Sequence, residues 1–409
     1  YIYGSSKSLA IKDAARWQGS QLCISLPRPR PRFATWILVG CGLAAVLTLA
    51  AWLGSPLWKS PPLPGGPAHI PRPAQDSDLL TVGRGGMFKT IKQALEAARP
   101  SVTIRVLDDG VYAEQLAMDT PAKHEGILLE AVAGATIELT QGSRRALLIQ
   151  DTARICVRGF RFTDTLVDGG GSFISISSHT PGVVLEDLDI QGSDHSRGID
   201  FLNVAMAKKE PPVIVRRCRI RVGFVAISVV GTEGAGPESA ATAMISIRDN
   251  VVLRASKGVL LQGAVADIHV TGNIFGNCGH AGIQIEDAAG MKDILIANNT
   301  AFDSGSGFRI WDDEPFESLE AGQVVVRSNL FFGHIDSDMG FILQSGGKSK
   351  TREPGDLDSL IRLWRFEHNW RDLSGSASKY KLPIAPGDRQ LATAELISRE
   401  ASDQDFLRP

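Results

Sequence analysis

The sequence predicts an all-β fold, a parallel β-helix in which short strands stack coil upon coil. Seven times between Val184 and Asn369, an apolar residue is followed three positions later by a small, mostly polar residue. The apolar residues are Val184, Val215, Ile247, Val270, Ile296, Val326 and Phe366, and their partners are Asp187, Cys218, Asn250, Asn273, Asn299, Asn329 and Asn369. One such unit cannot bury its own apolar face, so its repetition indicates a solenoid.

A second repeated feature is a glycine followed by apolar–x–apolar, later in five of these units. These stretches begin at Gly198, Gly258, Gly282, Gly307 and Gly340. Each unit therefore predicts two or three short strands joined by tight bends. Asparagines at the same bend are expected to stack their amides into a ladder, with coils about 4.8 Å apart. A leucine-rich repeat horseshoe is the alternative fold, but the units lack its leucine framework.

Composition narrows the functional classes. The 409 residues carry a formal net charge of −2, so the basic stripe of a nucleic-acid-binding protein is not expected. The chain has 42 glycines, which suits a fold with many sharp corners. Its cysteines show no CxxC or other metal spacing, and we predict neither a metal nor a cofactor. We interpret Cys218, at the ladder position, as a small buried filler.

Residues 33–53 contain no charged side chain and predict one transmembrane helix, which at 1.5 Å per residue spans about 31 Å. Basic residues precede this stretch, and only Lys59 and Arg72 follow it closely. The positive-inside rule therefore puts residues 1–32 in the cytoplasm and the large domain outside. A cleaved secretory signal is the competing interpretation. Residues 1–32 are also consistent with the tail of a longer protein.

The expected domain order after the membrane span is a linker, the solenoid and a short cap. Residues 54–78 are rich in proline and predict an extended, semi-rigid linker. The β-helix is predicted over residues 79–373, and residues 374–409 are expected to form a C-terminal cap or tail. A helix within Phe88–Ala98, with Thr90 as its N-cap, is expected to cover the first coil.

The opening segment resembles pectin methylesterases and other members of the pectin lyase-like superfamily. The resemblance rests on Thr81–Leu95, on Thr103–Val106 and on Gly110–Glu114, which reads GVYAE. In that superfamily the GxYxE turn opens a right-handed parallel β-helix. The resemblance therefore implies this fold, and it implies polysaccharide binding along one outer face of the coil.

The candidate ligand-binding residues follow from strand alternation. The middle residue of each glycine–apolar–x–apolar strand should point outward. Stacking the coils then gives one outward column of Asp200, Ser228, Leu260, Gln284, Arg309 and Ile342. The predicted ligand-binding residues are Asp200, Gln284, Arg309, Trp311 and Asp312.

Catalysis is left open by the sequence. Ser193–Asp200, Gly279–Gly282 and Gly307–Trp311 resemble, in part, the motifs of polygalacturonases, and they make Asp200, His280 and Arg309 the candidate catalytic residues. An inverting glycosidase also needs two carboxyl groups roughly 6.5–9.5 Å apart. The column offers Asp200 no such partner, and the methylesterase motifs are incomplete.

Two charged segments have alternative interpretations. Asp312, Asp313, Glu314 and Glu317 could hold a cation beside Arg309, as in pectate lyases, but a solvated loop is the simpler interpretation. The basic strand of Arg216, Arg217, Arg219 and Arg221 could meet an acidic polysaccharide or balance nearby acids.

The sequence thus predicts a single-pass membrane protein with an extracytoplasmic β-helix that binds a carbohydrate or another surface polymer. The expected partners are a polysaccharide and, through residues 33–53, the membrane, with no nucleic acid. Two alternatives stay open: a polysaccharide-processing enzyme such as a glycosidase or lyase, and the external sensor domain of a longer membrane receptor or kinase.

Overall fold

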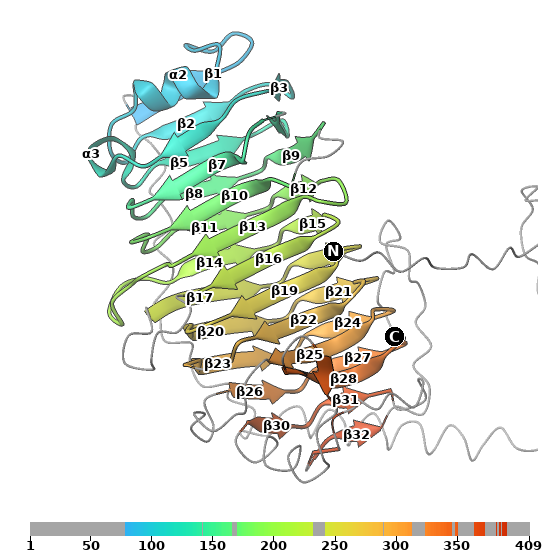
Figure 1. The fold of residues 1–409 in the computed structure, drawn as a ribbon. Coiled ribbons are helices and arrows are strands. Elements are labelled where there is room, and N and C mark those ends of the chain that lie inside the picture. Colours follow the sequence, from blue (N-terminus) through green and yellow to red (C-terminus); the bar gives the residue numbers. More distant parts are fainter. Residues whose placement is uncertain are drawn as a thin grey trace, which may run out of the picture. The chain divides into compact units, whose positions relative to one another are not determined.

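The computed structural model describes residues 78–140, 142–165, 170–231, 242–288, 290–312, 324–345, 348–350, 364–372, 382, 384–385 and 387–390. Their strands form three sheets that run along one solenoid (Figure 1). Successive strands of the chain belong to different sheets, and neighbours within each sheet come from successive coils. This arrangement is the predicted right-handed parallel β-helix.

The first sheet has eleven strands in the order β1 (Leu79–Val82), β2 (Thr103–Val106), β5 (Leu128–Ala131), β8 (Cys156–Arg158), β11 (Val184–Glu186), β14 (Val213–Arg216), β17 (Thr242–Arg248), β20 (Ala266–Thr271), β23 (Lys292–Ala297), β26 (Val324–Arg327) and β30 (Arg365–Glu367).

The second sheet has ten strands in the order β4 (Leu116–Met118), β7 (Arg145–Gln150), β10 (Ser172–Ser177), β13 (Arg197–Leu202), β16 (Val225–Val230), β19 (Lys257–Gln262), β22 (Ala281–Glu286), β25 (Ser306–Asp312), β28 (Ser337–Ser345) and β29 (Lys348–Lys350). Only its last strand, β29, pairs antiparallel within this sheet.

The third sheet has eleven strands in the order β3 (Val111–Tyr112), β6 (Thr136–Leu139), β9 (Arg161–Asp164), β12 (Asp189–Gln191), β15 (Arg219–Arg221), β18 (Val251–Leu253), β21 (Ile274–Gly276), β24 (Thr300–Phe302), β27 (Leu330–Phe332), β31 (Trp370–Arg371) and β32 (Arg389–Gln390).

The asparagine ladder is confirmed from Asn250 onward. The Asn250 side-chain amide donates to Asn273 Oδ1 at 2.9 Å, and the same bond recurs at 3.0 Å from Asn273 to Asn299 and from Asn299 to Asn329. The ladder continues to Asn369. Each ladder asparagine also has its backbone N–H bonded to the next rung, so the ladder fixes the vertical register of the bends.

The prediction that Asp187 belongs to this ladder, with Val184 three residues before it, is wrong. The register pairs Leu185 with Val215, so the ladder position in this coil is Leu188. Asp187 instead takes the left-handed conformation of the bend (φ 55°) and forms an ion pair with Arg217 at 2.8 Å. The chain enters the bend one residue later than the sequence pattern indicated.

The repeated glycines are explained by close approach of successive coils. A Cβ on Gly198 would lie 2.3 Å from the carbonyl oxygen of Ala226, and one on Gly258 would lie 2.3 Å from that of Gly282. No side chain fits in this space without moving the neighbouring backbone. These glycines therefore allow the second sheet to pack closely as it begins on each coil.

The predicted cap is present as α2 (Ile91–Glu96). Thr90 Oγ1 accepts the Gln93 N–H at 3.1 Å, and Ile91 and Leu95 are buried. Glu114, the last residue of the GVYAE turn, accepts the N–H of Lys92 at 2.8 Å. A carboxylate at this helix N-terminus satisfies free donors and complements the helix dipole. A second short helix, α3 (Pro121–His124), lies between β4 and β5.

At the other end the ladder finishes on an acid. Asn369 donates to Asp388 Oδ1 at 3.1 Å, and β32 pairs with β31. Arg371 meets Asp338 at 2.6 Å, with both side chains almost fully buried. Residues of the predicted C-terminal cap therefore contribute a rung and a strand to the solenoid.

A small apolar cluster lies outside the main core, on the outer face of the third sheet. It consists of Leu253, Phe302 and Phe332, and the two phenylalanine rings stack at 5.8 Å. The inward neighbours Val252, Ala301 and Phe331 belong to the interior core instead, as strand alternation requires.

Within the described ranges, no helix is long and apolar enough to cross a bilayer. The span predicted at residues 33–53 lies outside those ranges, as do residues 1–32 and the linker as far as residue 77.

Candidate functional site

The predicted residues lie on the outer face of the second sheet between β13 and β28, which we call the polar face. The register aligns Asp200, Ser228, Leu260, Gln284 and Arg309 in one column. The prediction that Ile342 continues this column is wrong. Met339 pairs with Phe308, and both side chains lie in the core. Gly340 therefore pairs with Arg309 and takes the column position, whereas Ile342 pairs with Trp311.

The column is much less exposed than outward alternation alone suggests. Gln284 is 1% exposed, Asp200 4% and Arg309 6%. One reason is that long side chains lie along the face. Lys257 is level with Ala281, yet its Nζ reaches Glu286 Oε1 at 2.5 Å, so the lysine extends past the Gln284 position. Gln284 Nε2 donates to the same glutamate oxygen at 2.5 Å.

Arg309 folds back along its own strand. Its Nη2 donates to Ser306 Oγ at 3.0 Å and forms an ion pair with Asp336 Oδ2 at 2.7 Å. Its Nε is buried without a hydrogen-bond partner, and so is Oε1 of Gln284 on the neighbouring strand. Buried polar atoms are normally paired, so two such atoms on adjacent strands indicate unused capacity for binding.

His280 stands beside this group at the corner before β22, with an exposed ring. Partial desolvation lowers the pKa of His280, and the positive charges of Arg309 and Lys257 lower it further, against the opposing effect of Glu286 and Asp336. The imidazole is therefore neutral at pH 7 and can accept a hydrogen bond.

The structure thus brings three predicted residues together and adds three that sequence reasoning missed. His280, Gln284 and Arg309 share one environment with the additional residues Lys257, Glu286 and Asp336. Glu286 could have been found, because strand alternation puts it on the same face as Gln284. No sequence signal marks Asp336, which precedes its strand in a corner.

Asp200 lies elsewhere on the polar face. It is three strands from Gln284, or about 14 Å at the usual strand spacing. It accepts hydrogen bonds from Ser172 and Ser228 on the flanking strands, and Arg197 Nη1 lies 3.7 Å from its Oδ1. The guanidinium of Arg197 also lies over the Phe224 ring at 4.8 Å.

The remaining predicted residues are at the far end of the same strands. Trp311 is partly exposed and pairs in register with Glu286. Asp312 ends β25, and its backbone pairs with Leu343. The cation cluster considered at Asp313, Glu314 and Glu317 lies outside the described residues.

The basic segment is divided between β14 and β15, and two of its four arginines, Arg216 and Arg217, form ion pairs. Arg216 Nη2 meets Glu186 at 2.6 Å, and Arg217 binds both Glu186 and Asp187. Glu130 similarly binds Arg105 and Arg158 on the flanking strands. This ladder of opposite charges on the first sheet favours the interpretation that the arginines balance nearby acids.

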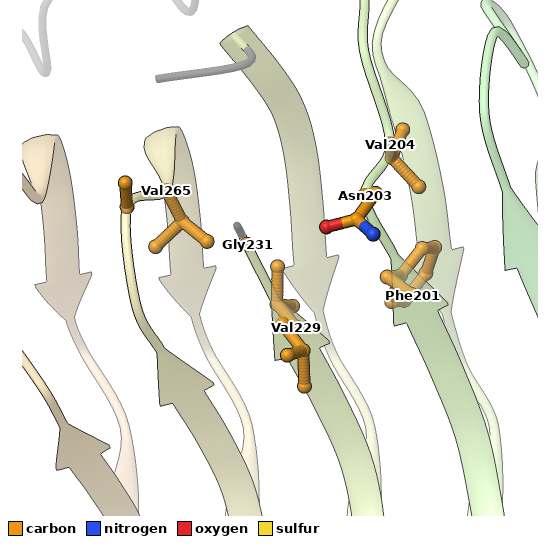
Figure 2. Close-up of a pocket in the computed structure, with 8 residues that line it drawn as sticks. Phe201, Asn203, Val204, Val229, Gly231 and Val265 are labelled. Carbon is orange, nitrogen blue, oxygen red and sulfur yellow. The ribbon is translucent and has the colours of Figure 1, made fainter. Parts of the chain in front are cut away.

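A separate small pocket opens where β13 and β16 end. It is lined by Phe201, Asn203, Val204, Val229, Val230, Gly231, Ala264 and Val265, which are drawn in Figure 2. None of the predicted site residues lines it, and its lining carries no charge.

Among the described residues, no group of three or more histidine, cysteine, aspartate or glutamate side chains is arranged to hold a metal ion. Burial raises the pKa of Cys156, Cys218 and Cys278 to about 12, so these thiols stay protonated at neutral pH.

Comparison with known proteins relates part of the chain to one family. Residues 164–350 match the family model described as "Periplasmic copper-binding protein (NosD)". No curated protein sequence matches the chain.

Several solved structures are similar over most of their length. A complex of XylC with xylose is 11% identical (TM-score 0.47) and is aligned over 78% of this chain and 87% of that one. The A-module of a mannuronan C-5 epimerase from Azotobacter vinelandii is 13% identical (TM-score 0.43), and the alignment covers 74% of this chain and 93% of that one. An exopolygalacturonase from Thermotoga maritima is 11% identical (TM-score 0.37), and the alignment covers 63% of this chain and 87% of that one.

Three stacked sheets of parallel strands, an internal asparagine ladder and a capping helix at the first coil define the architecture. The chain therefore has the right-handed parallel β-helix fold of the pectin lyase-like proteins, with a central part similar to the NosD family.

Proposed function

We propose that this chain is an extracytoplasmic β-helix domain that binds a polysaccharide on its polar face. The observation that carries the proposal is the pair of buried, unpartnered polar atoms, Gln284 Oε1 and Arg309 Nε, on adjacent strands. Leaving such atoms unpaired costs about 1–3 kcal/mol each, a cost that a hydroxyl-rich ligand would remove by displacing the side chains that cover them.

The surroundings of this pair suit a sugar ligand. Glu286 and Asp336 offer carboxylate acceptors, Lys257 and Arg309 offer donors, and Trp311 adds an aromatic surface at the strand end. A repeating polymer also suits a face that repeats with every coil.

The proposed location rests on two features. The NosD family is described as periplasmic, and it matches the central coils. Residues 33–53 are proposed to anchor the domain in the membrane, with residues 1–32 in the cytoplasm, because of their hydrophobicity and flanking charge.

Copper binding, which the NosD description names, does not fit the described residues. Copper prefers imidazole, thiolate and thioether ligands gathered at one point. Here the three described cysteines are buried and protonated, and the described histidines, cysteines and acids form no cluster of three.

A polysaccharide-processing enzyme is the second candidate. Glu286 and Asp336 supply two carboxylates from the coils on either side of β25, and the register puts Glu286 at the end of its strand and Asp336 just before the start of β28. The neutral His280 ring is close enough to both carboxylates for each to oppose the lowering of its pKa.

The test is glycan-array binding by the full chain, compared with variants Gln284→Leu and Arg309→Gln. Both variants are expected to lose the wild-type signal at least tenfold, whereas Arg219→Gln on the outer face of the third sheet should keep it. Release of reducing ends from the bound glycan would favour the enzyme instead. Equal array signals for all four proteins would contradict the proposal.

A further inference from the structure

A second group of residues on the polar face repeats the chemistry of the first. Arg197, Asp200 and Phe224 form an arginine–carboxylate–aromatic group, in which the arginine contacts both of the others. The Phe224 ring is 39% exposed and the Arg197 side chain 36%, so a ligand can reach both.

The first group has the same three components. Arg309 binds Asp336, and Trp311 is two residues further along the same strand. The Asp336 side chain is 52% exposed. Strands β13 and β25 are separated by β16, β19 and β22, so the two groups are four strand spacings apart, or about 19 Å.

Among the described residues of the second-sheet strands from β13 to β25, every lysine and arginine is paired with a carboxylate. Ser228 and Leu260 occupy the column between Asp200 and Gln284. Lys257, on the same face, is neutralised by Glu286. Each of the three cations from β13 to β25 therefore has its own carboxylate: Arg197 with Asp200, Lys257 with Glu286, and Arg309 with Asp336.

This charge balance bears on the class of ligand. An acidic sugar would have to displace a carboxylate from its cation or approach a face whose described cations are already paired, and neither gives a favourable electrostatic contribution. Uncharged hydroxyl groups can instead add to the free positions of the paired guanidinium and carboxylate groups, and sugar rings can stack on Phe224 and Trp311.

We propose that the ligand is an uncharged, linear glycan that contacts both groups at once, a proposal that rests on the proposed function. Because a sugar unit is roughly as long as one strand spacing, contact over about 19 Å, or four spacings, requires about five sugar units. Because the second contact is then intramolecular, a glycan that spans both groups should bind far more tightly than one that reaches only one of them.

The test is calorimetric titration of the full chain with xylo-, manno- and gluco-oligosaccharides of two, four, six and eight units, beside galacturonate and mannuronate oligomers of the same lengths. For at least one neutral series, we expect the affinity to rise at least tenfold between four and six units. We also expect it to change less than twofold between low and high salt. The uronates should bind at least tenfold more weakly.

Variants locate the two contacts. Arg197→Gln and Arg309→Gln should each reduce the affinity for the six-unit glycan to that of the two-unit glycan, and Arg219→Gln should leave it unchanged. Thermal unfolding midpoints within 2 °C of wild type would show that the variants fold.

Three results would overturn this inference. If the affinity does not depend on oligosaccharide length and is lost only in Arg309→Gln, the glycan contacts the Arg309 group alone. The proposed function would then stand without the second contact. Tighter, salt-sensitive binding of uronates would retain a polysaccharide ligand but contradict its neutrality. Failure of every oligosaccharide to bind would remove both the inference and the proposed function.

Discussion

Gln284 has a side-chain oxygen that is buried without a partner, although the equivalent position one coil earlier is filled by Leu260. A leucine therefore fits this column. We expect Gln284→Leu to leave the midpoint of urea unfolding unchanged or raised, because no buried acceptor is left unpaired. Glycan binding should fall at least tenfold.

The matched control is Gln191→Leu on strand β12 of the third sheet, where the glutamine amide bonds to Asp189 at 3.1 Å. This variant should bind glycan normally. A Gln284→Leu protein that unfolds earlier and still binds would show that the glutamine is structural.

His334 predicts a pH dependence of stability. It is 7% exposed, and burial lowers its pKa to about 4, against the opposing effects of the Asp338 charge and of the backbone at Ser304 and Ala301. The unfolded chain binds the proton near pH 6.5, so protonation favours unfolding. The stabilisation that neutral His334 provides is fully present above pH 6.5. As the pH falls towards 4 it is lost, which lowers the free energy of unfolding by about 3 kcal/mol.

The measurement is urea unfolding between pH 7 and pH 4 for the wild type and His334→Gln. The variant should lose less stability over this range, because glutamine does not titrate. Parallel pH profiles for the two proteins would show that His334 finds a partner or remains hydrated.

At the scale of one element, the ladder should depend on the side-chain amide rather than on the bend. Asn299 Oδ1 accepts two hydrogen bonds from Asn273, and its Nδ2 donates to Val270 O and Asn329. We expect Asn299→Ala to cost about 3 kcal/mol or more, because several buried partners lose their bonds.

Asn298 provides the control, since it is exposed and holds the left-handed conformation of the same bend (φ 56°). Asn298→Ala should cost about 1–2 kcal/mol, the usual cost of that conformation for alanine. Equal unfolding midpoints for the two variants would contradict a structural role for the ladder amides.

The repeats could be predicted because each coil needs the same apolar, small and bend residues at fixed intervals. Two register errors arose where the pattern allowed two alignments. At Val184 and Leu185 both residues are apolar, and the left-handed bend at Asp187 decides between them. At Gly340 the glycine marks the centre of the strand rather than its beginning.

The site was harder to predict than the fold. Alternation put Gln284 and Arg309 on the outer face, but it could not show that Lys257 extends along that face to Glu286. Asp336 reaches Arg309 from a corner of the following coil, and corner residues follow no periodic pattern. Ion pairs between coils depend on side-chain length and direction, which repeat spacing does not encode.

At the scale of the molecule, the three sheets have different surfaces. The first carries a ladder of alternating charges from Arg105 to Arg216, and the third carries the apolar cluster around Phe302. On the second sheet, paired charges, an aromatic side chain and unpartnered buried atoms occur on the neighbouring strands β22 and β25. This combination is the reason we propose the second sheet as the binding face.

Carbodiimide labelling of carboxyl groups, read by mass spectrometry with and without the glycan selected on the array, tests this assignment most directly. Asp336 is the exposed carboxylate of the polar face, and Asp187, of similar exposure, lies at the bend between the first and third sheets. Bound glycan should reduce labelling of Asp336 severalfold and leave Asp187 unchanged. Protection of Asp187 with Asp336 still fully reactive would contradict binding on the second sheet.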